Sequence, residues 1–292
     1  MHQLELLHLA HSKRIVNVAS VPQRSPFRYP GGKTWLVPHV RRWFDSFPNK
    51  PRLLVEPFAG GGIIGLTVAF ERLADRVLLV ELDKQVAGVW QALLGDDADW
   101  LANRILSFKL TSGSVAEELS KNSSSVRDVA FRTLLRNRTN HGGIMAPGAG
   151  LIKNGESGKG ISSRWYPDTL AKRVRDVGRI KDRIDFVQGD GLAAIREHAE
   201  EPETVFFIDP PYTAGGKKAG TRLYTYNELD HEALFRLART VHGDFLMTYD
   251  NADGVRDMAA THGFDVLAVP MKNTHHAEMD ELVIGRNLQW AR

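Results

Sequence analysis

The tetrapeptide Asp209-Pro210-Pro211-Tyr212 directly follows the apolar run Thr204 to Ile208, and it is the most informative motif in the chain. Two consecutive prolines fix the backbone and remove two N–H donors. Their preceding carbonyl groups remain as acceptors beside a carboxylate and an aromatic ring. This combination suits an exocyclic amine on a planar ring, because the amine offers two hydrogens and the ring needs a stacking surface. A rigid turn would explain the prolines but not the flanking Asp and Tyr.

A second motif, Glu56 to Gly62 (EPFAGGG), lies between an apolar run and a helical pattern. Glycines at such a turn let the backbone approach a ligand closely. Glu81 ends the next apolar run, 21 residues after Gly60, where an acid accepts hydrogen bonds from ribose hydroxyls. The spacing indicates an adenosine-containing cofactor: NAD, FAD or S-adenosylmethionine. Glycine turns also occur for packing alone.

The third motif is Arg28 to Lys33 (RYPGGK). It can be a plain turn before a helix, or it can bring the Tyr29 ring and the Lys33 ammonium to the carboxylate of a cofactor. Taken by itself, the motif favours the plain turn.

These motifs need a scaffold, and the apolar pattern predicts an α/β fold. Short apolar runs alternate with helical patterns such as residues 63–73, which is typical of a mostly parallel sheet with helices on both faces. Glu56, Glu81, Asp190 and Asp209 end four of the runs, at the sheet edge where ligands bind in open α/β folds. The predicted strands are 52–56, 77–80, 185–188, 204–208 and 245–248, with 266–269 and 281–285 closing the sheet as a hairpin.

The amino-acid composition limits the classes of protein to which the chain can belong. The 292 residues are 42% apolar and 25% charged, with a formal net charge of +3, as in an ordinary globular protein. The absence of cysteine excludes disulfides, cysteine-based zinc sites and a cysteine nucleophile. We see neither an apolar run long enough to span a membrane nor a secretory signal pattern, so we expect a cytoplasmic protein without a membrane partner.

Charge is concentrated in the middle of the chain. Residues 104–183 hold 16 Lys and Arg against 7 Asp and Glu, while the remainder is net acidic. A basic segment on an acidic body suggests a polyanion partner, although a solvated insertion with charged faces gives the same pattern. We predict an N-terminal extension (1–25), a catalytic domain in two parts (26–95 and 185–292) and an inserted basic target-recognition domain (96–184).

Together and in this order, the motifs resemble the Dam-like family of DNA adenine-N6 methyltransferases. The resemblance runs from about Ser25 to Asn287 and includes RYPGGK, VEPFAGGG, the acid of VELD, DPPY and ELVIGRN. Residues 137–142 (NRTNHG) resemble part of the family's DNA-recognition region. The resemblance implies a Rossmann-like methyltransferase fold, S-adenosylmethionine as methyl donor and S-adenosylhomocysteine as product. It also implies double-stranded DNA as substrate.

The resemblance also implies roles for individual residues. Asp209, Pro210, Pro211 and Tyr212 would hold and activate the target adenine. No metal is implied, because a sulfonium is already a good leaving group. The cofactor would be bound by Tyr29, Lys33, Phe58, Ala59, Gly60, Glu81 and Asp190, with Glu81 on the ribose, Asp190 on the adenine and Lys33 near the carboxylate.

A base inside a duplex cannot be reached in this way, so we expect the adenine to be flipped out. Phosphate contacts from the inserted segment would offset the cost of unstacking. The candidate DNA-binding residues are Arg132, Arg136, Arg138, Asn140, Lys153, Lys159 and Arg164. We expect a monomer, and a cognate restriction endonuclease as a functional partner is compatible with this activity.

Three alternatives stay open. The chain can be a methyltransferase for another amine: cytosine N4, an amine in RNA, or a protein amide. Methyltransferases for these substrates use related tetrapeptides. It can be a catalytically silent DNA-binding protein of the same fold, against which the intact Asp209 and Tyr212 argue. A nucleotide-dependent oxidoreductase would fit the glycine turn but would leave DPPY unexplained.

Overall fold

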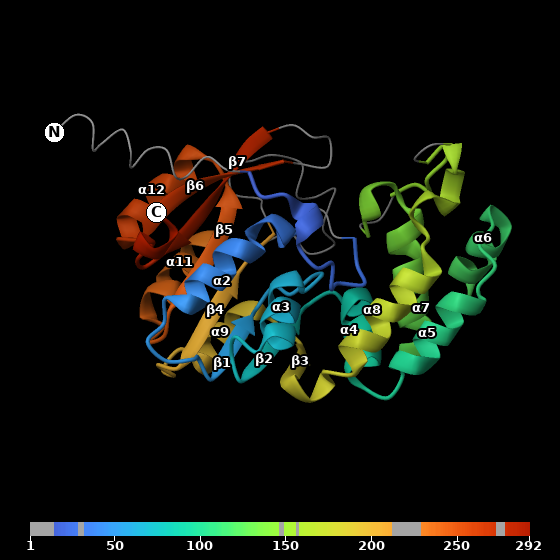
Figure 1. Ribbon diagram of the computed structural model, residues 1–292, viewed down its shortest axis with the longest axis horizontal. Coiled ribbons are helices and arrows are strands. Elements are labelled where there is room, and N and C mark those ends of the chain that lie inside the picture. The colour runs from blue at the N-terminus through green and yellow to red at the C-terminus, as the bar shows by residue number, and fades with distance from the viewer. Residues whose placement is uncertain (1–14, 29–31, 146–148, 156–157, 212–228, 273–277) are drawn as a thin grey trace.

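A computed structural model describes residues 15–28, 32–145, 149–155, 158–211, 229–272 and 278–292. Its centre is a seven-stranded sheet with strand order β3-β2-β1-β4-β5-β7-β6 (Figure 1). The first five strands run parallel, and β7 is antiparallel to both β5 and β6. The strands are β1 (Leu53–Glu56), β2 (Arg76–Glu81), β3 (Ile184–Gln188), β4 (Thr204–Ile208), β5 (Phe245–Asp250), β6 (Asp265–Lys272) and β7 (Glu278–Gly285).

All seven predicted strands are present, so the predicted α/β fold class is confirmed. The terminal hairpin is longer than predicted, because β6 and β7 pair without interruption from Asp265 opposite Gly285 to Lys272 opposite Glu278. The helix predicted over 63–73 ends earlier, at Glu71. Arg72 adopts a left-handed conformation with φ of 57°, which terminates the helix.

Helices cover both faces of the sheet (Figure 1). Alternate strand residues point to opposite faces, so Val205 and Phe207 belong to one apolar cluster and Phe206 and Ile208 to the other. The first face carries α2 (Val37–Asp45), α3 (Ile63–Glu71) and α4 (Lys84–Leu94), and the second carries α9 (Gly191–His198), α11 (His231–Thr240) and α12 (Asp253–His262).

The segment between β2 and β3 extends the first face sideways. It forms α5 (Ala98–Ser107), α6 (Ser112–Ser120), α7 (Val126–Thr139) and α8 (Pro167–Gly178), and α7 packs on α4 while α8 packs on α5. Buried Phe131 and Val174 belong to the same apolar cluster as Trp90 of α4. The predicted inserted segment therefore shares a continuous core with the sheet's first face. Between α7 and α8 the described backbone is largely irregular.

Part of the predicted N-terminal extension packs against the rest of the protein. Val21 and Ser25 are buried, and the Ser25 hydroxyl donates a hydrogen bond to the Gly61 carbonyl in the glycine turn after β1. Among the described residues, no helix combines the length and the apolarity needed to cross a lipid bilayer.

Candidate active site

The carboxyl ends of β1 and β4 meet at the point where the strand order reverses. From β1 the chain proceeds outward to β2 and β3, whereas β4 pairs with the other side of β1 and leads on to β5. In open α/β sheets this is where a crevice forms and ligands bind. The glycine turn follows β1 and Asp209 follows β4, so the two strongest sequence motifs lie at this point.

The glycine turn is held by packing as well as by its own geometry. Gly62 has φ of 61°, and a Cβ there would lie 2.7 Å from the Trp90 ring. The same indole donates a hydrogen bond of 3.0 Å to the Gly60 carbonyl. Ala59 donates its N–H to the Val80 carbonyl at 2.9 Å, which ties the turn to β2. The turn is thus fixed between α4 and the sheet.

Glu81 connects the turn to the next strand end. Its Oε2 accepts the Gly60 N–H and its Oε1 accepts the Asp83 N–H, both at 2.8 Å. Burial raises the pKa of Glu81 to about 7, against the lowering effect of these two N–H groups. The carboxylate lies beside the glycine turn, where the 21-residue spacing predicted it.

The turns after β1 and β3 touch each other. A Cβ on Gly191 would lie 2.3 Å from the Pro57 carbonyl oxygen and 3.0 Å from the Phe58 ring, so only glycine allows this approach. Asp190 is exposed, and its side chain accepts the Leu192 N–H at 2.9 Å as the N-cap of α9. Phe58, Glu81 and Asp190 are therefore contributed by the ends of three adjacent strands.

Asp209 takes part in a buried ion triad. Its Oδ1 lies 2.9 Å from Lys33 Nζ and accepts a 2.8 Å hydrogen bond from the Thr248 hydroxyl. Lys33 Nζ also lies 3.0 Å from Glu281 Oε1 on β7. The side chains of Lys33 and Glu281 are 3% and 7% exposed, whereas that of Asp209 is 24% exposed. Asp209 is thus the member of the triad that can meet a substrate.

The sequence analysis did not single out Glu281 or Thr248. Both follow from the order of the sheet, since β5 lies beside β4 and β7 beside β5. This order brings Thr248 to Asp209 and Glu281 to the Lys33 ammonium that contacts Asp209. The glutamate of ELVIGRN was the signal available for Glu281. Lys33 is expected near a cofactor carboxylate, and in the structure its Nζ also contacts Asp209 and Glu281.

Glu56 is a second buried acid close to Asp209. It is 3% exposed, and its Oε2 accepts the Gly65 N–H at 2.7 Å. Burial raises the pKa of Glu56 to about 8, and the nearby charge of Asp209 contributes in the same direction. At neutral pH Glu56 is therefore mostly protonated.

The raised pKa of Glu56 predicts a pH dependence of stability. The folded state holds this proton up to about pH 8, whereas the unfolded chain releases it near 4.5. The free energy of unfolding should therefore fall as pH rises between these values. In Glu56→Gln this contribution is absent, so its urea-unfolding free energy should change less from pH 5 to pH 8. Equal pH dependence in the wild type and in Glu56→Gln would contradict the raised pKa of Glu56. Glu81 titrates in both proteins, so its contribution cancels in the comparison.

The predicted site residues fall into three groups. Phe58, Ala59, Gly60, Glu81 and Asp190 gather around the glycine turn, while Asp209, Pro210 and Pro211 lie at the end of β4. Tyr29 and Tyr212 lie outside the described residues. Among the described residues, no group of three or more His, Asp or Glu side chains is arranged to hold a metal ion.

The predicted DNA-binding residues differ in accessibility. Lys153 and Lys159 are exposed, and Arg132, Arg136 and Arg164 are partly exposed. Arg138 and Asn140 are only 5% and 4% exposed. Their side chains donate to the carbonyl groups of Pro26 and Ile144 respectively, so neither reaches the surface to contact DNA directly. The reason is packing, because α7 turns this side toward the segment before Tyr29.

Asn137, which directly precedes Arg138, is fully buried and hydrogen-bonds the backbone of Arg28. Its Nδ2 donates to the carbonyl groups of Arg28 and Gly143 at 2.9 Å, and its Oδ1 accepts the Arg28 N–H at 2.8 Å. The NRTNHG stretch therefore contributes at least partly to structure, by joining the inserted helices to the chain that leads to Lys33.

Comparison with known proteins gives a family match. A family model described as D12 class N6 adenine-specific DNA methyltransferase matches residues 29–268. No curated protein sequence matches the chain. One similar solved structure is titled "crystal structure of a putative RNA methyltransferase PH1948 from Pyrococcus horikoshii", with 12% identity over 98% of both chains and a TM-score of 0.41. Another is the rRNA methyltransferase aviRa from Streptomyces viridochromogenes, with 15% identity over 84% of this chain and 80% of that one, and a TM-score of 0.39.

Proposed function

The chain belongs to the D12 class N6 adenine-specific DNA methyltransferase family, and we propose that it transfers a methyl group from S-adenosylmethionine to the N6 amine of a flipped adenine in duplex DNA. The observation that carries the proposal is Asp209. It lies partly exposed at the end of β4, is contacted by Lys33 and Thr248, and stands next to the end of β1, which leads into the glycine turn.

The residues around the glycine turn fit the proposed cofactor. Glu81 and Asp190 offer carboxylate oxygens at the ends of β2 and β3, suited to ribose hydroxyls and to an adenine amine respectively. Phe58 offers a half-buried ring close to Gly191, and Gly60 has a backbone φ of 47°, which glycine adopts readily. When bound there, the cofactor supplies an electrophilic methyl group on a sulfonium.

Asp209 is the group that acts on the target amine. An exocyclic amine is a poor nucleophile, since its lone pair is delocalised into the ring. The Asp209 carboxylate and the Pro210 carbonyl accept its two hydrogens, which favours a pyramidal nitrogen with its lone pair directed at the methyl. As the new bond forms, the nitrogen becomes positive, so the attraction to Asp209 is greater in the transition state than in the ground state.

Lys33 and Glu281 position Asp209 for this role. Lys33 Nζ and the Thr248 hydroxyl both contact Oδ1 and fix the orientation of the carboxylate. Glu281 holds the other side of the ammonium, so the lysine does not fully cancel the negative charge of the site. After methyl transfer the cationic nitrogen is acidic, and it loses its extra proton to solvent at the exposed edge of Asp209.

Glu81 provides a direct test of cofactor binding. Glu81→Ala removes the proposed ribose acceptor, and a hydrogen bond to a charged group contributes about 1.5–3 kcal/mol. We expect the dissociation constant for S-adenosylhomocysteine, measured by calorimetry, to rise roughly 10- to 100-fold. Asp182→Ala, at an exposed acid away from the site, serves as the control. Unchanged affinity in Glu81→Ala would remove Glu81 from the cofactor site.

Substrate identity is tested by product analysis. The purified chain is incubated with unmethylated genomic DNA and with total RNA, each with radiolabelled S-adenosylmethionine, and the digested nucleosides are separated. We expect N6-methyldeoxyadenosine to be the labelled product. Labelled N4-methyldeoxycytidine would identify cytosine as the substrate, and label in RNA alone would identify RNA. Either result would contradict the proposed substrate. Cofactor binding without any transfer would indicate a catalytically silent member of the family. Sequencing of the methylated DNA identifies the recognised site, from which a cognate endonuclease can be sought.

A further inference from the structure

Three arginines meet at the segment Ser25 to Arg28, where the inserted helices join the sheet body. Arg138 of α7 donates to the Pro26 carbonyl, and Arg173 of α8 donates to the Ser25 carbonyl at 3.2 Å. Arg28 lies on the segment itself, and Asn137 forms hydrogen bonds with its backbone N–H and carbonyl groups. Two helices and one connecting segment thus each contribute an arginine to this place.

This arginine cluster (Arg28, Arg138 and Arg173) has an unusual charge environment. Among the described residues, neither Arg138 nor Arg173 pairs with a carboxylate, and the buried Nε of Arg138 has no hydrogen-bond partner. Burial, together with the nearby charges of Arg173 and Arg28, lowers the pKa of Arg138 to about 9. Placing like charges together away from water is unfavourable, and a bound anion would relieve it.

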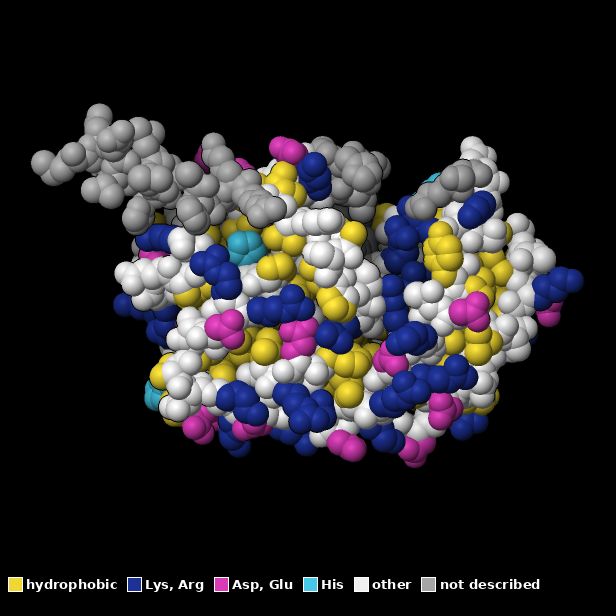
Figure 2. All heavy atoms as spheres, in the orientation of Figure 1, with side chains coloured by type: hydrophobic (Ala, Val, Ile, Leu, Met, Phe, Trp, Pro, Cys, Tyr) yellow, Lys and Arg dark blue, Asp and Glu magenta, His cyan; other side chains and the backbone are white. Residues whose placement is uncertain are grey.

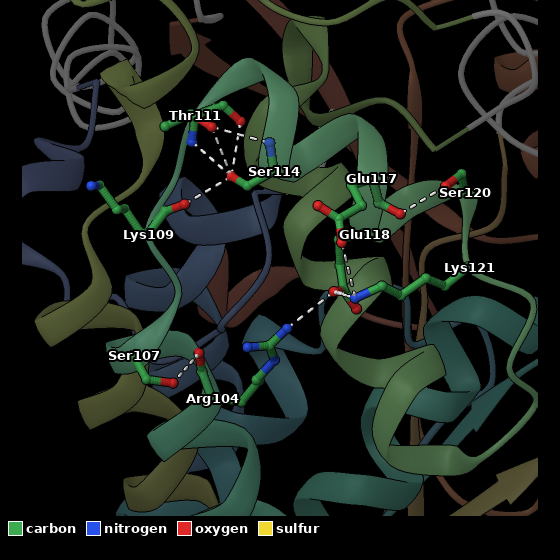
Figure 3. A network of polar contacts seen from close by, with 9 residues as sticks. All are labelled: Arg104, Ser107, Lys109, Thr111, Ser114, Glu117, Glu118, Ser120 and Lys121. Atoms are coloured by element: carbon green, nitrogen blue, oxygen red, sulfur yellow. Dashed lines mark hydrogen bonds and ion pairs between the residues drawn. The ribbon is translucent and has the colours of Figure 1, made fainter.

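Other basic side chains of the inserted segment are neutralised within the protein. Arg104 donates to Glu118 at 3.0 Å, and Lys121 lies 2.8 Å from the same carboxylate (Figure 3). Arg179, directly after the helix that carries Arg173, pairs with Asp176 at 2.9 Å. The excess positive charge of residues 104–183 is thus not spread evenly. Figure 2 shows Lys and Arg side chains gathered along the boundary between the sheet body and the inserted helices.

The cluster lies next to the proposed active site. Ser25 donates to the Gly61 carbonyl of the glycine turn, so the segment that Arg138 and Arg173 contact also touches the turn. Lys33, which contacts Asp209, follows Arg28 by five residues, a span of roughly 17 Å at full extension. A group bound at the cluster is therefore within a few nucleotides of a base held at Asp209.

We propose that Arg173, supported by Arg28 and the buried Arg138, binds a phosphodiester of the DNA strand close to the flipped adenine. The inference rests on the proposed function. Guanidinium groups match the paired oxygens of a phosphate, and partly exposed Arg173 and Arg28 can present them. The buried Arg138 raises the positive potential behind them without touching the strand. A phosphodiester fits better than the cofactor carboxylate, because two of the arginines come from the inserted helices rather than from the strand ends that carry Glu81 and Asp190.

The test compares Arg173→Gln with Arg179→Gln, since the second residue lies at the end of the same helix but pairs with Asp176. Binding to a fluorescent duplex containing the mapped methylation site is measured by anisotropy at several salt concentrations. Loss of one phosphate contact should reduce the slope of log affinity against log salt by about 0.9. We expect this reduction in Arg173→Gln and not in Arg179→Gln, with unchanged affinity for S-adenosylhomocysteine in both.

A neutral methylphosphonate at single positions then locates the phosphate. One position near the target adenine should weaken binding by the wild type and have no further effect on Arg173→Gln. Wild-type slopes in Arg173→Gln would overturn the inference, as would loss of cofactor affinity with DNA binding retained. If the wild-type chain neither binds nor methylates DNA, the proposed function itself fails, which is a separate outcome.

Discussion

Asp209→Asn should abolish nearly all methyl transfer while leaving cofactor binding intact. The substitution keeps the shape of the side chain but removes the charge that is attracted to the developing cation on the target nitrogen. Removing one preorganised electrostatic group from an active site typically lowers kcat by about 10²–10³-fold. Because the asparagine also cannot accept the same hydrogen bond from Thr248 with full strength, we expect a loss of about 10³-fold or more in single-turnover rate.

The measurement is the transfer of a labelled methyl group to duplex DNA, with calorimetric binding of S-adenosylhomocysteine as the parallel assay. Asp250→Asn is the matched control, since Asp250 ends the neighbouring strand β5 and has no assigned role in the site. The control should keep near wild-type rates. A normal transfer rate in Asp209→Asn would exclude the proposed mechanism, whatever the substrate.

Lys33→Met should have the largest effect on stability of any single change at the site. It leaves Asp209 and Glu281 facing one another without the ammonium that lies 2.9 and 3.0 Å from them. Breaking a buried ion pair by removing one partner costs about 3–5 kcal/mol. We expect a decrease of this size in the free energy of unfolding, measured in urea. Lys50→Met, at an exposed lysine paired with Asp75, should cost no more than about 1 kcal/mol.

The double variant Lys33→Met with Glu281→Gln separates stability from catalysis. Neutralising Glu281 removes the unpaired buried charge, so part of the lost stability should return. If Lys33 acts by orienting Asp209, kcat stays low in the double variant. In the single variant Lys33→Met, the acid limb of the pH–kcat profile should move to higher pH, because removing a cation disfavours ionisation of nearby carboxylates. Recovery of full activity together with stability would show that Lys33 is structural only.

The sequence by itself determined the sheet and the ends of its strands. Apolar runs of four to six residues are long enough to span a buried sheet and too short for helices, so their positions could be predicted from residues such as Thr204 to Ile208. The acids that end these runs, Glu81 and Asp209, could be assigned to one edge because parallel strands present the same ends together. The motifs around them were sufficient to identify the family.

Only the tertiary structure decided which charges meet. Lys33 contacts Asp209 and Glu281, which lie 176 and 248 positions further along the chain, and no local pattern encodes such a pairing. Arg138 and Asn140 read as surface residues in a basic stretch, yet α7 directs them inward. Strand and helix propensities arise from neighbouring residues, whereas burial and ion pairing arise from how whole elements pack. For this reason the chemistry at Asp209 was readable in the sequence, and the groups that orient it were not.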